Sequence, residues 1–412
     1  MHKLTSQCFH PAKAESLEQT GLPRGLIVDL VLKYAFFEGT ISLADLIERS
    51  KLSPNIIQSV YQQLHQERLC ESRSYESRIS LNSKGRGLAE IALKKSQYIG
   101  PVPVTLADYQ RAVSAQSLRL DLTADSLKST LDDLILADSV LKELGAALQS
   151  GGTILLYGST GNGKTSLAER LPRLFHDLIY VPYAVEVAGQ IVTVFDAQVH
   201  QVESKVREGA DPRWLICRRP MVKVGGELRV EMLDTRVDEI TRMCTAPLQM
   251  KANNGILLID DFGRQRITPR ELLNRWIVPL DRRKDILSTP SGVTFEIPFE
   301  LLVVFATNLS LSDLAEEAFM RRLHNKIKID PLSEDLFREL LRRVCNEKQV
   351  PCSQDMEDYI VKECSRHSPN ALRACFPNDL MTIACGVAAF ERRTHGVDKS
   401  SFDEAIRIYF AR

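Results

Sequence analysis

Hydrophobic positions in the first hundred residues recur with the spacing of short helices. An apolar helical period runs from Pro23 to Gly39, a second helix is expected over residues 42–50, and Ser53 followed by Pro54 opens a third. Two short strands around a polar turn (69–82) and a fourth helix (84–97) follow. This order predicts a winged helix-turn-helix-like domain over residues 21–98, preceded by a flexible segment at 1–20.

The pattern changes beyond a Pro- and Gly-containing stretch, which predicts a linker over residues 99–130. Short apolar runs at 153–157, 256–259 and 301–306 alternate with helical patterns, as expected for an α/β domain with a parallel sheet. After Pro331 the pattern is helical throughout. The predicted fold class is therefore an α/β P-loop core over 131–330, a parallel sheet flanked by helices, with a C-terminal helical lid over 331–412 and the N-terminal winged-helix-like domain.

A phosphate-binding loop lies between the first apolar run of this core and the helix that follows it. The sequence GSTGNGKT matches G-x-x-x-x-G-K-[ST] at every position. Glycines let backbone N–H groups point at phosphate oxygens, and the helix start adds partial positive charge. Lys164 is expected to reach the β and γ phosphates and Thr165 to ligate Mg²⁺. The predicted nucleotide-binding residues are Gly158, Ser159, Thr160, Gly161, Asn162, Gly163, Lys164, Thr165 and Ser166.

Polar side chains end the next two apolar runs. Asp260 and Asp261 follow the run at 256–259, and Asn308 follows the run at 301–306. Parallel strands deliver such residues to the carboxyl edge of the sheet, where ligands bind. Asp260 is expected to hold Mg²⁺, Asp261 to orient or deprotonate the attacking water, and Asn308 to position that water.

With these motifs in order, residues 130–412 resemble an AAA+ ATPase. The stretch ELLNRWIVPLDRRKDILSTPSGVTFEIPFELLVVFATNLS resembles the AAA+ segment in which a helix and a small hairpin lead to the sensor-1 strand, with Asn308 at the sensor-1 position. The stretch EEAFMRRLHNKIKIDP resembles the segment that carries the arginine finger. The resemblance implies ATP and Mg²⁺ as ligands, Arg321 or Arg322 as the finger, and a homo-oligomeric ring, most often a hexamer.

Two positions depart from the family pattern. AAA+ proteins usually have glutamate where this chain has Asp261, whose side chain is one methylene shorter and would hold water farther away. The sensor-2 arginine tends to follow a proline at a helix start, but Asn378 follows Pro377 here, and Arg373 is a possible substitute. Because of the first departure, hydrolysis of ATP could be slow.

The core also carries an insertion at about 183–250, which could line a ring's pore, cover the site or decorate the rim. Within it, Gly225-Gly226 predicts a β-hairpin and residues 238–244 predict a helix.

The amino-acid composition indicates the cellular compartment but not the class of binding partner. Lys plus Arg and Asp plus Glu both number 53, so overall charge gives no case for a nucleic-acid or membrane partner. The amino terminus lacks a secretion signal, and no apolar run is long enough to span a membrane. The nine cysteines form no C-x-x-C pair and are expected to be reduced. A soluble cytoplasmic protein is expected.

The N-terminal domain leaves two kinds of partner open. The predicted reading helix at 54–67 has no Lys or Arg, although Gln and Asn side chains could read bases. Residues 1–100 carry 13 Lys/Arg and 10 Asp/Glu, and Arg73, Arg78, Lys84 and Arg86 lie in or near the wing. DNA contact through residues 53–86 and protein docking both remain open. At the level of the whole chain, the two hypotheses are an ATPase that remodels a protein or nucleic-acid partner and an ATP-switched scaffold or regulator with little turnover.

Overall fold

The computed structural model describes residues 9–71, 78–203, 209–314, 320–369, 371–393 and 397–411. The chain divides into two compact units. The first comprises Met1–Leu118, Phe175–Leu257 and Arg266–Leu302. The second comprises Arg119–Leu174, Leu258–Gln265 and Val303–Arg412.

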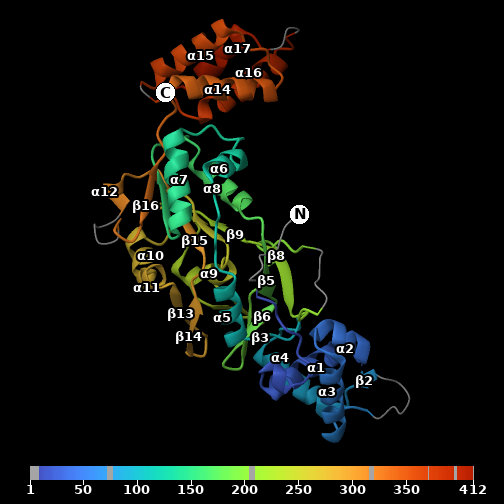
Figure 1. The fold of residues 1–412 in the computed structure, drawn as a ribbon. Coiled ribbons are helices and arrows are strands. Elements are labelled where there is room, and N and C mark those ends of the chain that lie inside the picture. Colours follow the sequence, from blue (N-terminus) through green and yellow to red (C-terminus); the bar gives the residue numbers. More distant parts are fainter. Residues whose placement is uncertain are drawn as a thin grey trace. The chain divides into compact units, whose positions relative to one another are not determined.

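A five-stranded sheet contains the three apolar runs of the predicted core (Figure 1). Its strand order is β16 (Asn325–Lys328), β4 (Ile154–Tyr157), β15 (Leu302–Thr307), β12 (Ile256–Ile259) and β9 (Met221–Val224). Strand β4 pairs in parallel with both of its neighbours. All four residues of β12 and all six of β15 are buried, which explains why these strands read as continuous rather than alternating apolar runs.

The second unit contributes further helices and a 3-10 turn. They are α6 (Ala124–Thr130), α7 (Asp138–Ser150), α8 (Lys164–Arg170), η2 (Leu171–Leu174) and α12 (Leu311–Leu314). The predicted α/β P-loop core is confirmed by the position of β4 between β15 and β16 and by the start of α8 at Lys164. This arrangement agrees with the fold class that the sequence predicts.

Four helices follow the sheet and form the predicted helical lid. They are α14 (Glu334–Glu347), α15 (Gln354–His367), α16 (Cys375–Phe390) and α17 (Lys399–Tyr409). Ser333 and Ser353 cap the first two helices by accepting backbone N–H bonds. A common core of apolar side chains, including Phe337, Leu380 and Phe402, holds the bundle together.

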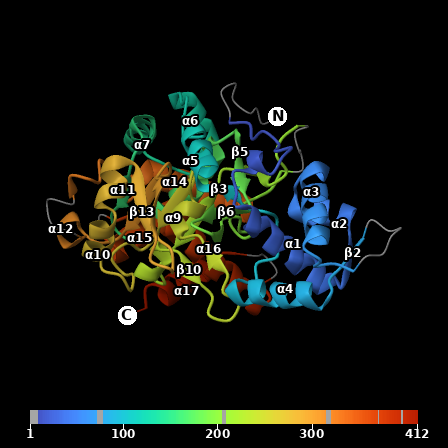
Figure 2. The same ribbon diagram turned by 90° about the horizontal axis from the view of Figure 1, so that it is seen from below.

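The N-terminal part of the first unit has helices where the sequence predicts them. They are α1 (Arg24–Glu38), α2 (Leu43–Ser50), α3 (Pro54–Gln66) and α4 (Ser83–Lys95), with η1 (Glu18–Thr20) before them. Figure 2 shows α1 and α4 beside each other, and Lys33 of α1 donates to the Ser96 carbonyl at 2.6 Å.

The wing region is only partly described. Strand β2 (Arg78–Ser80) pairs antiparallel with β1 (Thr40–Ser42), a strand that the sequence did not predict, whereas Cys70 makes a single bridge to Leu81. Residues 72–77, which include Arg73, lie outside the described residues. The winged-helix assignment therefore stays a prediction.

Two segments predicted as a flexible terminus (1–20) and a linker (99–130) make packing contacts, the first in residues 9–20, since 1–8 lie outside the described residues. The Phe9 ring lies 5.2 Å from the Trp214 ring, and the Asp211 N–H donates to the Pro11 carbonyl, so residues 9–20 are held in place. Within 99–130, β3 (Val104–Thr105) pairs with β6 (Ala184–Val187), and α5 (Leu106–Ala115) follows. Apolar side chains on α5 such as Tyr109 are buried, which outweighs the loop signal of the nearby prolines.

The predicted insertion forms strands that belong to several sheets. Strands β5 (Leu178–Pro182) and β8 (Trp214–Arg218) pair with each other. A second sheet has the order β10 (Arg236–Val237), β11 (Cys244–Thr245), β7 (Gln190–Thr193), β6 and β3.

Two local predictions in this segment are wrong. The chain after Gly225-Gly226 does not return as a second strand, because β9 pairs with β12 and the chain continues into η3 (Val230–Leu233). The expected helix at 238–244 is a turn, because the Asp238 carboxylate accepts bonds from the N–H groups of Ile240 and Thr241.

The remaining elements of the first unit lead from β12 towards β15. Helix α9 (Leu248–Lys251) precedes β12. The elements between β12 and β15 are α10 (Pro269–Arg275), α11 (Ile277–Arg282), β13 (Lys284–Ser288) and β14 (Thr294–Pro298). Strands β13 and β14 form an antiparallel hairpin. The helices α10 and α11 and this hairpin precede β15, in the order that the resemblance implied.

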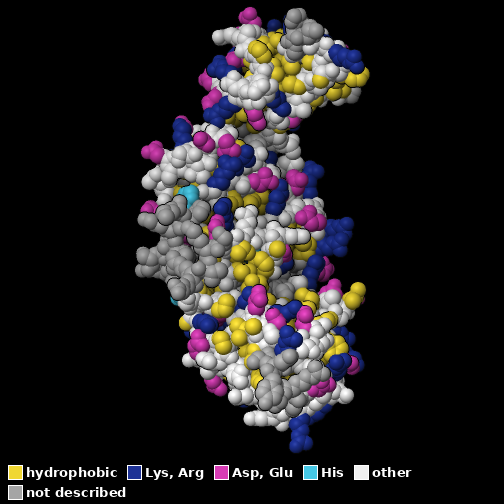
Figure 3. Space-filling view, turned by 90° about the vertical axis from the view of Figure 1, so that its right-hand side faces the viewer, with side chains coloured by type: hydrophobic (Ala, Val, Ile, Leu, Met, Phe, Trp, Pro, Cys, Tyr) yellow, Lys and Arg dark blue, Asp and Glu magenta, His cyan; other side chains and the backbone are white. Residues whose placement is uncertain are grey.

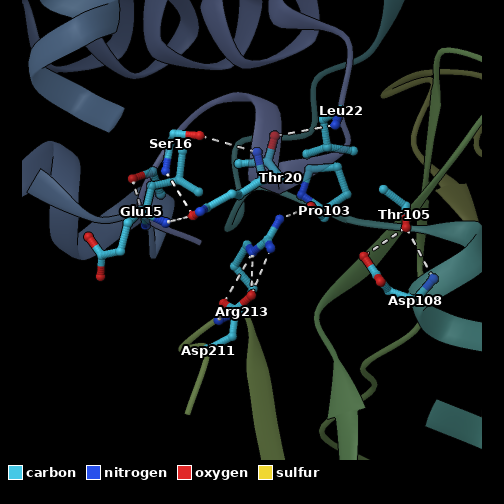
Figure 4. Close-up of polar contacts among 12 residues, drawn as sticks. Glu15, Ser16, Thr20, Leu22, Pro103, Thr105, Asp108, Asp211 and Arg213 are labelled. Carbon is cyan, nitrogen blue, oxygen red and sulfur yellow. Dashed lines mark hydrogen bonds and ion pairs between the residues drawn. The ribbon is translucent and has the colours of Figure 1, made fainter. Parts of the chain in front are cut away.

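A buried ion pair ties the segment before β3 to the segment before β8 (Figure 4). Arg213 and Asp211 are 4% and 3% exposed, and the guanidinium makes two-pronged contact with the carboxylate, at 2.7 Å for the shortest bond. The same guanidinium donates to the Pro103 carbonyl at 3.0 Å. Next to it, Thr105 caps α5 by accepting from the Asp108 N–H.

Surface charge is mixed on the face shown in Figure 3, where Lys and Arg side chains alternate with Asp and Glu. None of the helices in the described part of the chain combines the length and the apolar character that a membrane crossing requires.

Candidate nucleotide-binding site

The phosphate loop joins the end of β4 to the start of α8. Three glycines in it have positive φ: 137° at Gly158, 80° at Gly161 and 87° at Gly163. At Gly158 a Cβ atom would lie 2.4 Å from the Ile329 carbonyl oxygen, so a side chain has no room there. The glycines therefore allow both the backbone curl and the close approach of β16, which is the local structure that the motif predicts.

Lys164 lies inside the curl of this loop and is 8% exposed. Its ammonium donates to the carbonyls of Gly158 at 2.9 Å and Ser159 at 2.8 Å, which occupy two of its three N–H groups. Burial lowers the pKa of Lys164, and the nearby Asp261 and Asp260 carboxylates act in the opposite direction. An anion placed at the third N–H group would compensate the buried charge.

Two oxygen ligands meet at the mouth of the sheet. The Thr165 hydroxyl donates to Asp260 Oδ1 at 2.9 Å, although the two residues are 95 positions apart. A hydroxyl and a carboxylate are the hard oxygen ligands that Mg²⁺ takes, and protein sites for this ion commonly supply few ligands and leave the rest to water and phosphate. The described residues contain no cluster of three or more His, Cys, Asp or Glu side chains that could hold a metal ion alone. The donor set at Thr165 and Asp260 fits magnesium carried by a nucleotide.

Asp261 and Asn308 lie at the same edge of the sheet. Both line the cavity that contains the phosphate loop. Asp261 is exposed and has a φ of 48°. The Asn308 side-chain oxygen is buried and has no hydrogen-bond partner among the described residues, so it can accept a bond from a bound water or ligand.

The cavity itself has a volume of about 460 Å³. Its lining includes polar groups of the phosphate loop with Asp260, Asp261, Thr307 and Asn308. It also includes a set of mostly apolar residues from the segment before α7 and from the lid, namely Leu134, Ile135, Leu136, Leu340, Ala374 and Cys375, together with the polar Asp133, Asn378 and Asp379. A volume of this size, with apolar walls and a few convergent polar groups, is typical of small-molecule sites. It can take a planar base against the apolar wall and phosphates in the loop.

The lid contacts the phosphate loop directly. The Cys375 N–H donates to the Gly161 carbonyl at 2.9 Å, and a Cβ atom on Gly161 would lie 2.5 Å from the Cys375 sulfur. Of the two sensor-2 candidates, Asn378 lines the cavity. The Arg373 guanidinium instead lies 5.8 Å from the Phe376 ring, with its Nε buried and without a partner among the described residues.

The structure does not bring the arginine-finger candidates into this cavity. Arg321 is exposed and Arg322 is half-buried, and both lie just before β16. Neither is among the residues that line the cavity. The resemblance implied action on a neighbouring subunit, so a finger role for either residue stays a prediction.

Sequence reasoning missed several residues of the site. The apolar run Leu134-Ile135-Leu136 just before α7 carried a weak signal, because it is short and lies at the edge of the predicted linker. Leu340, Cys375 and Asp379 gave no signal, because they reach the cavity only through the packing of the lid.

Comparisons with known proteins add little to this geometry. Residues 333–408 match the family described as "Domain of unknown function (DUF8689)". No curated protein matches the chain. Solved structures similar to the chain include a RuvB Holliday junction branch migration motor of Thermotoga maritima, at 15% identity, with a TM-score of 0.39 and coverage of 68% of this chain and 71% of that chain. A RuvB point mutant has 14% identity, a TM-score of 0.41 and the same coverage of 68% and 71%.

Proposed function

We propose that this chain binds ATP with Mg²⁺ in the cavity between the phosphate loop and the lid, and hydrolyses it. The observation that carries the proposal is the 2.9 Å contact between the Thr165 hydroxyl and the Asp260 carboxylate, which unites the two predicted metal ligands beside the buried Lys164. An inert glycine-rich turn would not require an acidic strand end at this position.

The roles follow from the placement of each side chain. The loop N–H groups and Lys164 bind the phosphates, and Thr165 and Asp260 hold the ion, which supplies charge neutralisation on the transferred phosphoryl group. Asp261 takes the proton of the attacking water or orients it, and Asn308 positions that water through its unpaired oxygen. The phosphate site is shaped by the other loop residues, namely Gly158, Ser159, Thr160, Gly161, Asn162, Gly163 and Ser166. From the lid, the nucleotide is contacted by Asn378, which occupies the sensor-2 position, or by Arg373, which would replace the missing sensor-2 arginine.

The working form is proposed to be a homo-oligomeric ring, with a hexamer favoured, in which Arg321 or Arg322 reaches the nucleotide of a neighbouring subunit. Support comes from the AAA+ fold, from the resemblance of residues 316–331 to the finger segment, and from the lid's contact with the loop at Gly161. Such a ring would remodel a protein or nucleic-acid partner. Loss of turnover in the assembled Arg321→Ala or Arg322→Ala variant would support the shared site, and unchanged turnover in both would contradict it.

A phosphate-release assay tests the enzymatic proposal. The native chain is compared with Lys164→Ala and Asp261→Asn, and with Lys128→Ala as a matched control, because Lys128 is exposed on α6. Turnover is expected in the native chain and the control and to be lost in the two site variants. Equal rates in all four proteins would refute the proposal.

The second candidate function is an ATP-switched scaffold or regulator with little turnover, and the aspartate at position 261 favours it. Asp261 is one methylene shorter than the glutamate typical of the family, and its left-handed backbone must make up the difference in reach. Tight retention of labelled ATP by the native chain, without phosphate release, would favour this candidate.

DNA contact through residues 53–86 is proposed as one way in which the N-terminal domain engages a partner, and protein docking is the other. The cations Arg78, Lys84 and Arg86 support DNA, whereas the absence of Lys and Arg from α3 supports protein docking. Retarded migration of DNA that weakens steeply with salt would favour phosphate contacts.

A further inference from the structure

We propose that Gln265 is a positioning residue for hydrolysis, whose side-chain amide holds the turn after β12 in the conformation that presents the Asp261 carboxylate to the nucleotide cavity. This inference rests on the proposed ATPase function and extends it to a residue outside the phosphate loop, the acidic pair and the sensor position. The amide bonds to both sides of Asp261. Its nitrogen donates to the Asp260 carbonyl at 2.7 Å, and its oxygen accepts the Gly263 N–H at 2.8 Å.

The turn needs such a clamp because Asp261 is in a strained conformation. Its φ of 48° lies in the left-handed region, which is uncommon for a residue with a Cβ atom, although aspartate tolerates it better than most side chains do. A strained residue persists only where its surroundings over-determine the backbone. The Asp261 carbonyl also accepts the Arg264 N–H at 3.0 Å, and the Asp261 N–H donates to Asp260 Oδ1 at 3.1 Å, so Gln265 acts together with these bonds. Without the two bonds of Gln265, the Asp260–Gly263 turn would relax towards an ordinary conformation, and the carboxylate would move with it.

Phe262, directly after Asp261, is held in place independently of Gln265. The Phe262 N–H donates to the Ala306 carbonyl at 2.7 Å, and the Thr307 hydroxyl donates to the Phe262 carbonyl at the same distance. The Phe262 ring is buried, with its centroid 4.6 Å from the ring of Phe305. Strand β12 fixes the chain on the other side, so loss of the amide would free Asp261 locally without unfolding the sheet.

The resulting direction of Asp261 is useful for the reaction. Its carboxylate lines the cavity that holds the phosphate loop. Lys164 lines the same cavity, and its pKa is lowered by burial while the charges of Asp261 and Asp260 act in the opposite direction. Asp261 is therefore near enough to interact electrostatically with the lysine that would bind the phosphates.

Steady-state kinetics of two variants test this role. Gln265→Leu removes both hydrogen bonds at similar volume, and Gln265→Glu keeps an acceptor for the Gly263 N–H while replacing the donor to Asp260. The control is Thr268→Val, which removes the capping box of α10 three residues along the chain. Gln265→Leu is expected to lower kcat by about ten- to a hundredfold with less than a twofold change in KM, because displacement of a reacting group by about 1 Å has effects of this size. Thr268→Val is expected to lower the melting temperature and leave kcat unchanged.

The Gln265→Glu variant adds a readout that a purely structural role would not move. When the introduced carboxyl is protonated it again offers a donor to the Asp260 carbonyl, so the ratio of native to variant kcat is expected to fall as the pH is lowered from 8 to 5. This measurement also serves if Gln265→Leu does not fold. A pH-independent ratio, or a Gln265→Leu variant with native kcat, overturns the positioning role. A native chain with the same phosphate release as Lys164→Ala overturns the ATPase proposal as well, so the two failures are distinguishable.

Discussion

The three phosphate-loop glycines are expected to tolerate alanine to different degrees, because each meets a different obstacle. All three have positive φ, so alanine at any of them carries a backbone cost of about 1–2 kcal/mol. A Cβ atom at Gly163 would meet no atom within 4 Å, and Gly163→Ala is therefore expected to show this backbone cost alone in the free energy of unfolding.

Gly161→Ala adds a clash with the lid that a second substitution can remove. The new Cβ atom would lie 2.5 Å from the Cys375 sulfur, and overpacking of this kind costs about 1–3 kcal/mol. The total destabilisation is expected to be about 2–5 kcal/mol. Combining Gly161→Ala with Cys375→Ala removes the obstructing sulfur, so the pair is expected to recover the overpacking part and retain the backbone part.

Gly158→Ala meets the Ile329 carbonyl oxygen at 2.4 Å, which is backbone and which no side-chain substitution can remove. It is expected to be the most destabilising of the three. The assay is urea unfolding followed by circular dichroism, with the coupling between Gly161→Ala and Cys375→Ala taken from a double-mutant cycle. Equal destabilisation by Gly161→Ala and Gly163→Ala, or zero coupling to Cys375→Ala, would refute the close approach of the lid to the loop.

Three further outcomes are expected. Burial lowers the pKa of Lys33 from 10.5 to about 8, so the charged ammonium destabilises the folded state, and this cost is fully present below pH 8. Between about pH 8 and 10.5 the folded state loses this proton before the unfolded state does, so the free energy of unfolding of the native chain is expected to rise by roughly 3 kcal/mol relative to Lys33→Met. Urea unfolding at several pH values measures this difference. A flat difference across that window would contradict this. Arg213→Met leaves the Asp211 carboxylate buried without its cation and should cost about 3–5 kcal/mol, with a smaller loss when Asp211→Asn is added; additive losses would contradict the pairing. Thr165→Val should abolish the dependence of ATP retention on Mg²⁺ that the native chain shows in equilibrium dialysis, and unchanged dependence would remove Thr165 from the metal site.

The phosphate loop could be predicted from sequence because its determinants are local. A buried strand, glycines at positive φ and a helix start all lie within residues 153–170, and the acidic strand end at Asp260 carries its own signal. The same locality misled the prediction of a hairpin at Gly225-Gly226, where β9 pairs with the distant β12 instead of with its neighbour in sequence.

The parts of the site that the sequence did not reveal depend on long-range packing. Cys375 reaches Gly161 only because the lid packs against the loop, and nothing in the sequence distinguishes it from the other cysteines. Gln265 lies in a polar stretch with no hydrophobic periodicity. The two hydrogen bonds of its amide form only in the folded turn after β12, so the sequence gives no sign of them. Segment 238–244 has the side-chain spacing of a helix, which led to the wrong prediction. The spacing does not show that the Asp238 carboxylate competes with helical carbonyls for the Thr241 N–H.

The carbonyl of Ile329 makes the end of β16 part of the phosphate loop's wall. It accepts a bond from the Asn162 amide at 3.3 Å, and the Ile329 N–H donates to the Tyr157 carbonyl at 2.8 Å. Four residues later the chain reaches Ser333, the cap of the first lid helix. A shift of the loop around a ligand would thus act on the lid at two places, the start of its first helix and the Cys375 N–H that bonds the Gly161 carbonyl.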